Sequence, residues 1–256
     1  MPSYRLLLEY DGTDYAGWQW QPDQATVQGE VEQAVARVMG HGPIRVVGSG
    51  RTDSGVHALG QVASFASPAE RDPRNLRLGL NSVLPRDICC RDAQRAPDGF
   101  DARKHAKRKL YRYRLLDGNR RSALRLRQVA CEPITLDVAA MARAAAHLVG
   151  THDFTSFRAA GSDVPTSVRT LHRLEVARVA DEIVFEVEGD GFLRAMVRII
   201  VGTLVEVGRG RRDPESLLDV LAALDRSVAG RTALPQGLCL VWVEYPGLGP
   251  WGVTPA

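Results

Sequence analysis

The order of its hydrophobic segments most constrains how this 256-residue chain can fold. Segments with strand-like alternation and segments with apolar residues at helical spacing follow in the order strand, helix, strand, strand, helix, strand, and that order occurs twice. Such an order is typical of the split βαβ, or ferredoxin-like, arrangement, in which helices pack on a sheet. We therefore predict an α+β fold of two ferredoxin-like halves, 1–105 and 106–256, that share a largely antiparallel sheet with a central cleft.

Local signals set the bounds of each expected element. Thr26 can cap a helix whose apolar face includes Val27 and Val31, and Pro73 suits the first turn of the next helix. In the first half we expect strands at 4–10, 44–48, 61–66 and 88–94, and helices at 27–39 and 73–83. In the second half we expect strands at 110–116, 171–179, 182–188 and 238–245, and helices at 137–148, 192–207 and 214–224.

Composition excludes several classes of protein. The hydrophobic content of 45% and the charged content of 25% are ordinary for a folded domain. The longest apolar helix is interrupted by Arg194, Arg198 and Glu206, so we expect no membrane segment and a cytoplasmic setting. The cysteines lack the paired spacing of a zinc site and suggest no disulfide framework; they are Cys89, Cys90, Cys131 and Cys239.

A glycine-rich turn between two expected strands brings an arginine, a hydroxyl group and a carboxylate together. Its sequence over residues 48–60 is GSGRTDSGVHALG, with Arg51, Thr52 and Asp53 at the centre. Glycine supplies backbone conformations that other residues reach only with strain, and it lets a substrate approach the main chain closely. Because function concentrates in loops of this kind, this turn is the first candidate for chemistry.

Three interpretations of this turn can be weighed from the residues alone: a nucleotide-binding loop, a hydrolase site and a structural ion pair. A nucleotide-binding loop also begins GxG, but Asp53 stands where the third glycine is needed and no Gly-Lys-Ser/Thr follows. A hydrolase would combine Ser49 or Ser54 with His57 and Asp53, yet these residues are crowded on one turn, the sequence has no nucleophile elbow and nothing indicates an oxyanion hole. An ion pair between Arg51 and Asp53 could simply hold the turn, since exposed pairs are common and weak.

The segment GRTDSGVHALGQVASF, at residues 50–65, resembles the catalytic segment of tRNA pseudouridine synthases of the TruA type. Other stretches are similar to family segments and keep the family's order: EYDGT at 9–13 with Tyr15 and GWQ at 17–19, DFTSFR at 153–158, MVRIIVG at 196–202 and GL at 237–238. The resemblance implies a cofactor-free and metal-free isomerase that converts uridine to pseudouridine at nucleotides 38–40 of the tRNA anticodon arm. It also implies a homodimer in which one tRNA contacts both subunits.

In this resemblance Asp53 matches the catalytic carboxylate, and Arg51 matches the arginine that enters the RNA helix and displaces the target nucleotide. Taking a base out of its stack costs about a few kcal/mol, and a planar guanidinium can stack on bases or grip phosphate. A carboxylate can attack C6 of the base or C1′ of the sugar, or it can remove the C2′ proton, and the sequence leaves these routes open.

The resemblance also assigns residues in the second half. Tyr111 aligns with the tyrosine that stacks on the flipped uracil and takes the C5 proton, but Tyr113 lies on the same strand face, and either could be a core aromatic. Arg198 matches the arginine that pairs with Asp53 and keeps it ionised, and Leu240 matches an apolar pocket residue. The sequence departs from the family pattern at Arg194, Ala195 and Cys239.

Positive charge is concentrated between residues 103 and 127, where eleven Lys or Arg accompany one acid, Asp117. Such a block is either a solvated face or a site for a polyanion such as RNA. The candidates for phosphate contacts are Arg103, Lys104, Lys107, Arg108 and Lys109. Two rival functions stay open: an RNA-binding protein that keeps the fold without the activity, and a synthase that acts on a different uridine.

Overall fold

The computed structural model describes residues 1–161, 164–247 and 249–252, and in it the chain forms two compact units. The first unit comprises Met1–Lys107 and Leu240–Ala256, and the second comprises Arg108–Cys239. The halves expected from the sequence are 1–105 and 106–256, so the two divisions differ in the end of the chain. That end returns to the first unit because β10 (Leu238–Tyr245) lies next to β3 (His57–Ala66) in a sheet.

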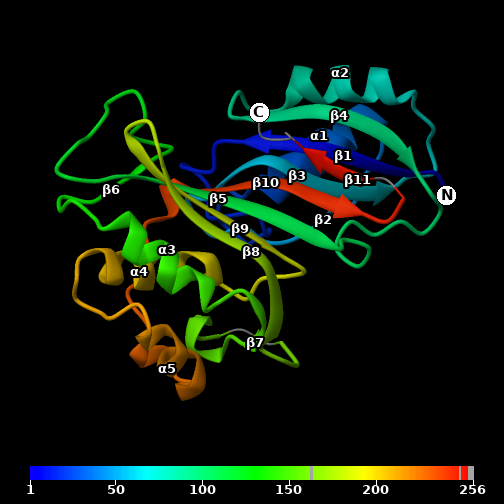
Figure 1. The fold of residues 1–256 in the computed structure, drawn as a ribbon. Coiled ribbons are helices and arrows are strands. Elements are labelled where there is room, and N and C mark those ends of the chain that lie inside the picture. The colour runs from blue at the N-terminus through cyan, green and yellow to red at the C-terminus, as the bar shows by residue number, and fades with distance from the viewer. Residues whose placement is uncertain (162–163, 248, 253–256) are drawn as a thin grey trace. The chain divides into compact units, whose positions relative to one another are not determined.

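The sheet of the first unit has the strand order β4-β1-β3-β10 (Figure 1). Strand β1 spans Ser3–Tyr10 and β4 spans Ile88–Ala96; the short strands β2 (Val47–Gly48) and β11 (Gly249–Gly252) pair with β3 and β10. The pairings of β1 with β3 and β4, of β2 with β3 and of β10 with β11 are antiparallel. Strand β1 is buried along almost its whole length, as the apolar run at 6–8 predicts.

Helices α1 (Val27–Met39) and α2 (Pro73–Val83) pack together on one face of this sheet (Figure 1). Thr26 caps α1, because its hydroxyl accepts a backbone N–H from the first turn. The two helices cross closely: a Cβ built on Gly79 of α2 would lie 2.9 Å from Cγ1 of Val38 in α1. Both helices have the bounds that the sequence predicts.

The second unit has its own antiparallel strands in the order β5-β9-β8-β7, and β6 pairs in parallel with β5. The strands are β5 (Arg108–Leu116), β6 (Ala130–Cys131), β7 (Gly150–Asp153), β8 (Val168–Val179) and β9 (Glu182–Gly189). The helices are α3 (Val138–Ala146), α4 (Met196–Gly208) and α5 (Ser216–Ala223), with 3₁₀ turns at Thr155–Phe157, Arg226–Val228 and Pro235–Gly237. Helix α4 is buried on nearly all sides and forms the centre of this unit's core. Among the described residues, no helix is long and apolar enough to cross a membrane.

The expected strand at 44–48 is wrong over most of its length, because side chains of α1 hold its backbone. The N–H of Val46 donates to Oε1 of Glu32 at 2.9 Å, and the carbonyl of Val46 accepts from Nε2 of Gln28 at 3.0 Å. The peptide groups on both sides of Val46 are therefore occupied, and strand pairing begins only at Val47. The expected helix at 192–207 is also shorter, since Ala195 has a left-handed backbone with φ of 57° and α4 begins after it.

A segment that we call the strap, residues 230–233, lies directly against α4. A Cβ built on Gly202 would lie only 1.7 Å from the carbonyl oxygen of Arg231. The strap is also tied to the first turn of the helix, because the N–H of Ala233 donates to the carbonyl of Arg198 at 3.0 Å. Glycine at position 202 thus permits the close approach that holds the strap beside Arg198.

Replacing Gly202 with alanine should therefore destabilise the second unit although alanine is the better helix former. The new methyl group must push the strap away, and overpacking of this kind costs about 3 kcal/mol. Gly191→Ala is the matched control, because its Cβ would meet only Arg169 at 3.6 Å. Guanidinium chloride titrations measure the free energy of unfolding of each variant and of the wild type. A loss of less than about 1 kcal/mol for Gly202→Ala would contradict the packing described.

Candidate active site

The turn between β2 and β3 combines buried residues with solvent-accessible ones. Ser49 and Thr52 are buried, with 0% and 6% of their surface exposed. Arg51 is exposed and Asp53 is half-buried. The two buried residues are anchors of the turn, and the arginine and carboxylate that the sequence singles out are more accessible than they are.

One anchor of the turn is the side chain of Gln61 on β3, which is fully buried. Its Oε1 accepts a hydrogen bond from the Ser49 hydroxyl at 2.7 Å, and its Nε2 donates to the carbonyl of Gly50 at 3.0 Å. The N–H of Ser49 also donates to the carbonyl of Val62 at 2.7 Å. These bonds fix the main chain immediately before Arg51.

The second anchor is the segment 9–18, which carries the opening motif of the chain. Oγ1 of Thr52 lies 2.9 Å from the hydroxyl of Tyr10, and the carbonyl of Thr52 accepts from the N–H of Trp18 at 3.0 Å. The Ser54 hydroxyl donates to the carbonyl of Tyr15 at 3.0 Å. The structure thus brings the two motifs, more than thirty residues apart in sequence, into contact on both sides of Asp53.

His57 connects the same two segments. Its Nδ1 accepts the N–H of Gly12 at 3.0 Å and lies 3.2 Å from Oδ1 of Asp11. Its Nε2 is buried and has no hydrogen-bond partner among the described residues. Since the Ser49 and Ser54 hydroxyls donate elsewhere, neither is activated by this imidazole, and the hydrolase interpretation fails.

The second unit distinguishes the two tyrosines that the sequence leaves open. The hydroxyl of Tyr113 donates to the carbonyl of Leu234 at 2.9 Å, its ring meets Phe185 edge to face, and burial raises its pKa. Tyr113 is therefore a core residue. Tyr111 is also buried, and its ring contacts Phe192 edge to face with 5.1 Å between centroids. Both tyrosines are thus buried on one strand, and the hydroxyl of Tyr113 is bonded within its own unit.

Arg198 lies in the first turn of α4, where the strap orients its side chain. Its Nε donates to the carbonyl of Ala233 at 2.9 Å, and the residue is half-buried. Arg198 and Tyr111 belong to the second unit, whereas Arg51, Asp53 and the buried Leu240 belong to the first.

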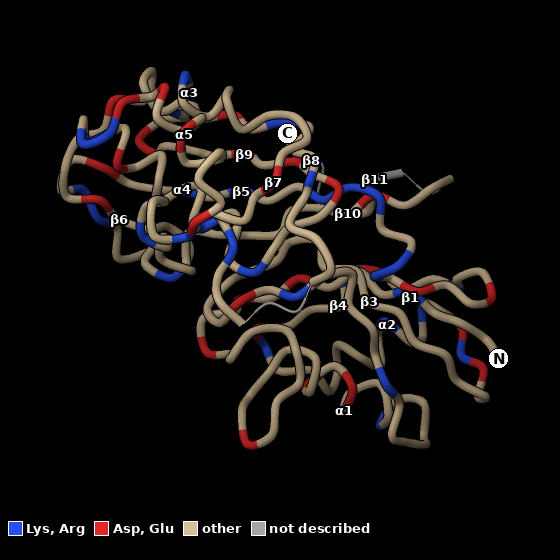
Figure 2. The backbone as a smooth tube through the Cα atoms, turned by 90° about the horizontal axis from the view of Figure 1, so that it is seen from below, with Lys and Arg blue, Asp and Glu red and all other residues tan. Residues whose placement is uncertain are grey.

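Much of the basic block pairs with acids rather than facing solvent alone. Along β5, arginines pair with glutamates of β9: Arg112 lies opposite Glu186 and pairs with it at 2.7 Å, and Arg114 reaches Glu182 at 2.6 Å. Further pairs are Arg108 with Glu188, Arg120 with Asp117, and Arg125 with Asp181. Figure 2 shows positive and negative residues interspersed along this part of the chain. The cations that are exposed and form no ion pair among the described residues include Arg103, Lys104 and Lys107.

Asp117 is the most deeply buried acid of these pairs, with 0% of its surface exposed. Arg178 donates two hydrogen bonds to it, at 2.8 and 3.0 Å, and the N–H of Leu136 adds a third at 3.0 Å. These donors, Arg178 above all, lower the pKa of Asp117 to about 2. Asp117 therefore holds a strand end and a loop together as an ionised carboxylate.

The free energy of unfolding should fall in acid through Asp117. Its folded-state pKa is about 2 against an ordinary 3.8, so its stabilisation is present above about pH 4 and is lost as the pH falls towards 2. The contribution is at most about 2 kcal/mol. Chemical denaturation of the wild type and Asp117→Asn between pH 5 and pH 2 measures it. The gap in stability between the two proteins should narrow with acid, and a constant gap would contradict this role.

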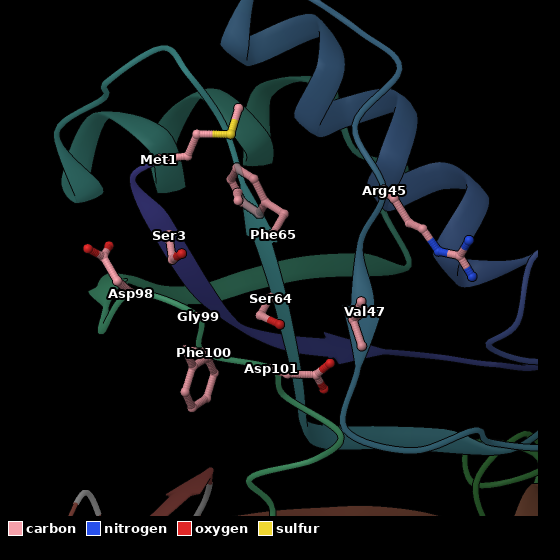
Figure 3. Close-up of a pocket in the computed structure, with 11 residues that line it drawn as sticks. Met1, Ser3, Arg45, Val47, Ser64, Phe65, Asp98, Gly99, Phe100 and Asp101 are labelled. Atoms are coloured by element: carbon pink, nitrogen blue, oxygen red, sulfur yellow. The ribbon is translucent and has the colours of Figure 1, made fainter.

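A hollow of about 460 Å³ opens elsewhere on the first unit, beside the end of β3 and the start of β1 (Figure 3). Its lining includes the carboxylates of Asp98 and Asp101 and the guanidinium of Arg45, but not Arg51 or Asp53. Two carboxylates against one cation disfavour phosphate binding. The turn at 48–57 is therefore a better candidate for a nucleic-acid site than this hollow.

Comparison with known proteins identifies a family whose sequences match most of this chain, the turn included. A family model for tRNA pseudouridine synthase matches residues 7–103 and 144–246. The tRNA pseudouridine synthase A of Geotalea uraniireducens is 45% identical over 245 residues, which cover 96% of this chain and 100% of that protein. The enzyme of the same name from Moorella thermoacetica is 49% identical over 253 residues, covering 96% of this chain and 100% of its own. The chain belongs to the tRNA pseudouridine synthase family.

This assignment places the chain in an isomerase family and confirms the resemblance drawn from its motifs. In this pseudouridine synthase, the described residues contain no group of three or more His, Cys, Asp or Glu arranged to hold a metal ion. Sequence reasoning missed Gln61 and Tyr10 as anchors of the turn. A usable signal was the amide of Gln61 in a mostly apolar strand, since a buried polar side chain needs partners.

Proposed function

We propose that this pseudouridine synthase isomerises uridine to pseudouridine at positions 38–40 of the tRNA anticodon arm, with Asp53 as the catalytic carboxylate. The observation that carries the proposal is the anchoring of the turn, in which Ser49 and Thr52 are buried while Arg51 is exposed and Asp53 half-buried. The names of the relatives and the match of residues 50–65 to the family's catalytic segment support the substrate and the role. We also propose that the protein acts in the cytoplasm, where a tRNA substrate is found.

The reaction is an internal rearrangement of one nucleotide and requires no cofactor. The bond between N1 of uracil and C1′ of the sugar breaks, the base turns while it is held, and C5 joins the same C1′. The proton on C5 leaves to solvent and N1 gains one, so uridine and product have the same composition. Asp53 would attack C6 or C1′, or remove the C2′ proton, and each role uses an ionised carboxylate.

Arg51 would help to take the target nucleotide out of its stack. Its side chain is exposed at the turn, two residues from Asp53, and a guanidinium can stack on a base or bind a phosphate bidentately. Extrusion costs about a few kcal/mol, which contacts to the RNA backbone must offset. The exposed cations Arg103, Lys104 and Lys107 are suited to such contacts, because they form no ion pair among the described residues.

Two residues of the second unit complete the proposed machinery. Tyr111 would stack on the flipped uracil and take the C5 proton, a role for which Tyr113 is unsuitable because its hydroxyl bonds to Leu234. Arg198 would pair with Asp53 and keep it ionised. Leu240 would supply apolar contact to the base. We also propose the split βαβ form for the first unit, which the order β4-β1-β3 with β2 beyond β3 supports, and a homodimer in which one tRNA contacts both subunits.

Replacing Asp53 with asparagine should abolish turnover and leave tRNA binding within about threefold of the wild type, since the amide keeps the shape but loses the charge. Tritium released from tRNA labelled at C5 of uracil measures turnover, and filter binding measures affinity. Carbodiimide mapping of the reacted tRNA should show pseudouridine at positions 38–40 with the wild type only.

Three results would contradict this assignment in different ways. Release by Asp53→Asn above a trace of the wild-type rate would remove Asp53 from the catalytic role. An unmutated protein that binds tRNA and releases no tritium would be an RNA-binding protein without activity. Modification outside positions 38–40 would make it a synthase for another uridine.

Removing Lys104 and Lys107 together should lower the dependence of tRNA affinity on salt. Each lysine that binds a phosphate contributes about 1 to the slope of log K against log salt, so the Lys104→Ala/Lys107→Ala protein should show a slope smaller by about 2. Arg112→Gln is the control, because Arg112 pairs with Glu186 and should not contribute to that slope. Equal slopes for all three proteins would show that the exposed cations form a solvated face.

A further inference from the structure

The amide of Gln61 contacts three groups that surround the inner side of the turn. Besides its bonds to the Ser49 hydroxyl and the Gly50 carbonyl, its Nε2 lies 3.4 Å from the hydroxyl of Tyr10. That same hydroxyl lies 2.9 Å from Oγ1 of Thr52. One side chain on β3 is thus connected to the residues on both sides of Arg51.

The hydrogen bonds of Gln61 are buried, and their burial bears on why an amide stands at this position. Gln61, Ser49 and Thr52 have 0%, 0% and 6% of their surface exposed, so water does not compete for their hydrogen bonds. A buried amide gains little over an apolar side chain of similar size, because it must first lose its own hydration. Packing alone would therefore be served as well by leucine or methionine at this position.

An amide offers what other side chains of its size do not. It carries one acceptor and two donors in a single plane, and here the acceptor faces Ser49 while the donors face Gly50 and Tyr10. A carboxylate would lack the donors, and methionine would lack both functions. The chemistry of Gln61 matches its three partners in number and in kind.

We propose that Gln61 is a positioning residue for the reaction: its amide sets the main chain at Gly50 and, through Tyr10, at Thr52, and so fixes the directions of Arg51 and Asp53. This inference rests on the proposed roles of Arg51 and Asp53. A displacement of about 1 Å at reacting groups lowers a rate by about a hundredfold. Loss of the amide should therefore lower the rate of the chemical step and leave the binding of tRNA nearly unchanged.

Gln61→Met is the test, because methionine fills a similar volume without hydrogen-bonding groups. Asn81→Leu is the matched control: Asn81 also uses its amide to bond main chain, the N–H and carbonyl of Cys90 at 2.8 and 2.9 Å, but on α2 and β4. Single-turnover tritium release, tRNA affinity and denaturant stability are measured for each. We expect Gln61→Met to release tritium about 10- to 100-fold more slowly with affinity within about threefold, and Asn81→Leu to keep the wild-type rate.

Ser49→Ala decides the matter if Gln61→Met does not fold, because it removes a single hydrogen bond to the same amide. We expect it to slow release by about threefold to tenfold at unchanged affinity; where Gln61→Met does fold, the two effects should not be additive in the double variant. Wild-type rates in folded Gln61→Met, or in Ser49→Ala where that variant alone folds, would overturn the inference, as would equal slowing by Asn81→Leu. Failure of the unmutated protein to release tritium would instead overturn the proposed function.

Discussion

Thr52 is the residue on which the geometry of the candidate site depends. Its side chain is held by Tyr10 at the end of β1, and its carbonyl is held by the N–H of Trp18. Both the side chain and the main chain of this residue are therefore held, and it stands between the exposed Arg51 and the half-buried Asp53. The opening motif at 9–18 and the turn at 48–57 are thus parts of one hydrogen-bonded structure.

The second unit shows that charge in a sequence is a poor guide to charge on a surface. The basic block places arginines along β5, where the antiparallel register puts Arg112 beside Glu186 of β9 and the side chain of Arg114 pairs with Glu182. These cations stabilise a sheet, and Arg178 serves the buried Asp117 in the same way. The cations of the block that are exposed and form no ion pair among the described residues include Arg103, Lys104 and Lys107, where the turn around Asp101 leaves side chains exposed. These are the residues that we propose for contacts to RNA.

The sequence predicted best what local chemistry decides. Helix α1 begins after its Thr26 cap and α2 begins at Pro73, as expected, because caps and apolar periodicity act within one turn. The irregular backbone at Val46 was not predicted, because its hydrogen bonds come from the side chains of Gln28 and Glu32 on a helix rather than from a neighbouring strand. In the candidate site, Arg51 and Asp53 were evident from their motif. The surroundings of Tyr113 were not, because its hydroxyl donates to the carbonyl of Leu234, far along the chain.

The most direct test is a crystal structure of the enzyme with a tRNA anticodon stem-loop that carries 5-fluorouridine at the target position. In this nucleotide fluorine replaces the hydrogen at C5, so the final loss of the C5 proton cannot take place. We predict that the target nucleotide is out of its stack, with the Asp53 carboxylate bonded to or touching its base or sugar and the Tyr111 ring against the base. A complex in which the nucleotide is bound away from Asp53, or stays stacked in the RNA, would contradict the catalytic role of that carboxylate.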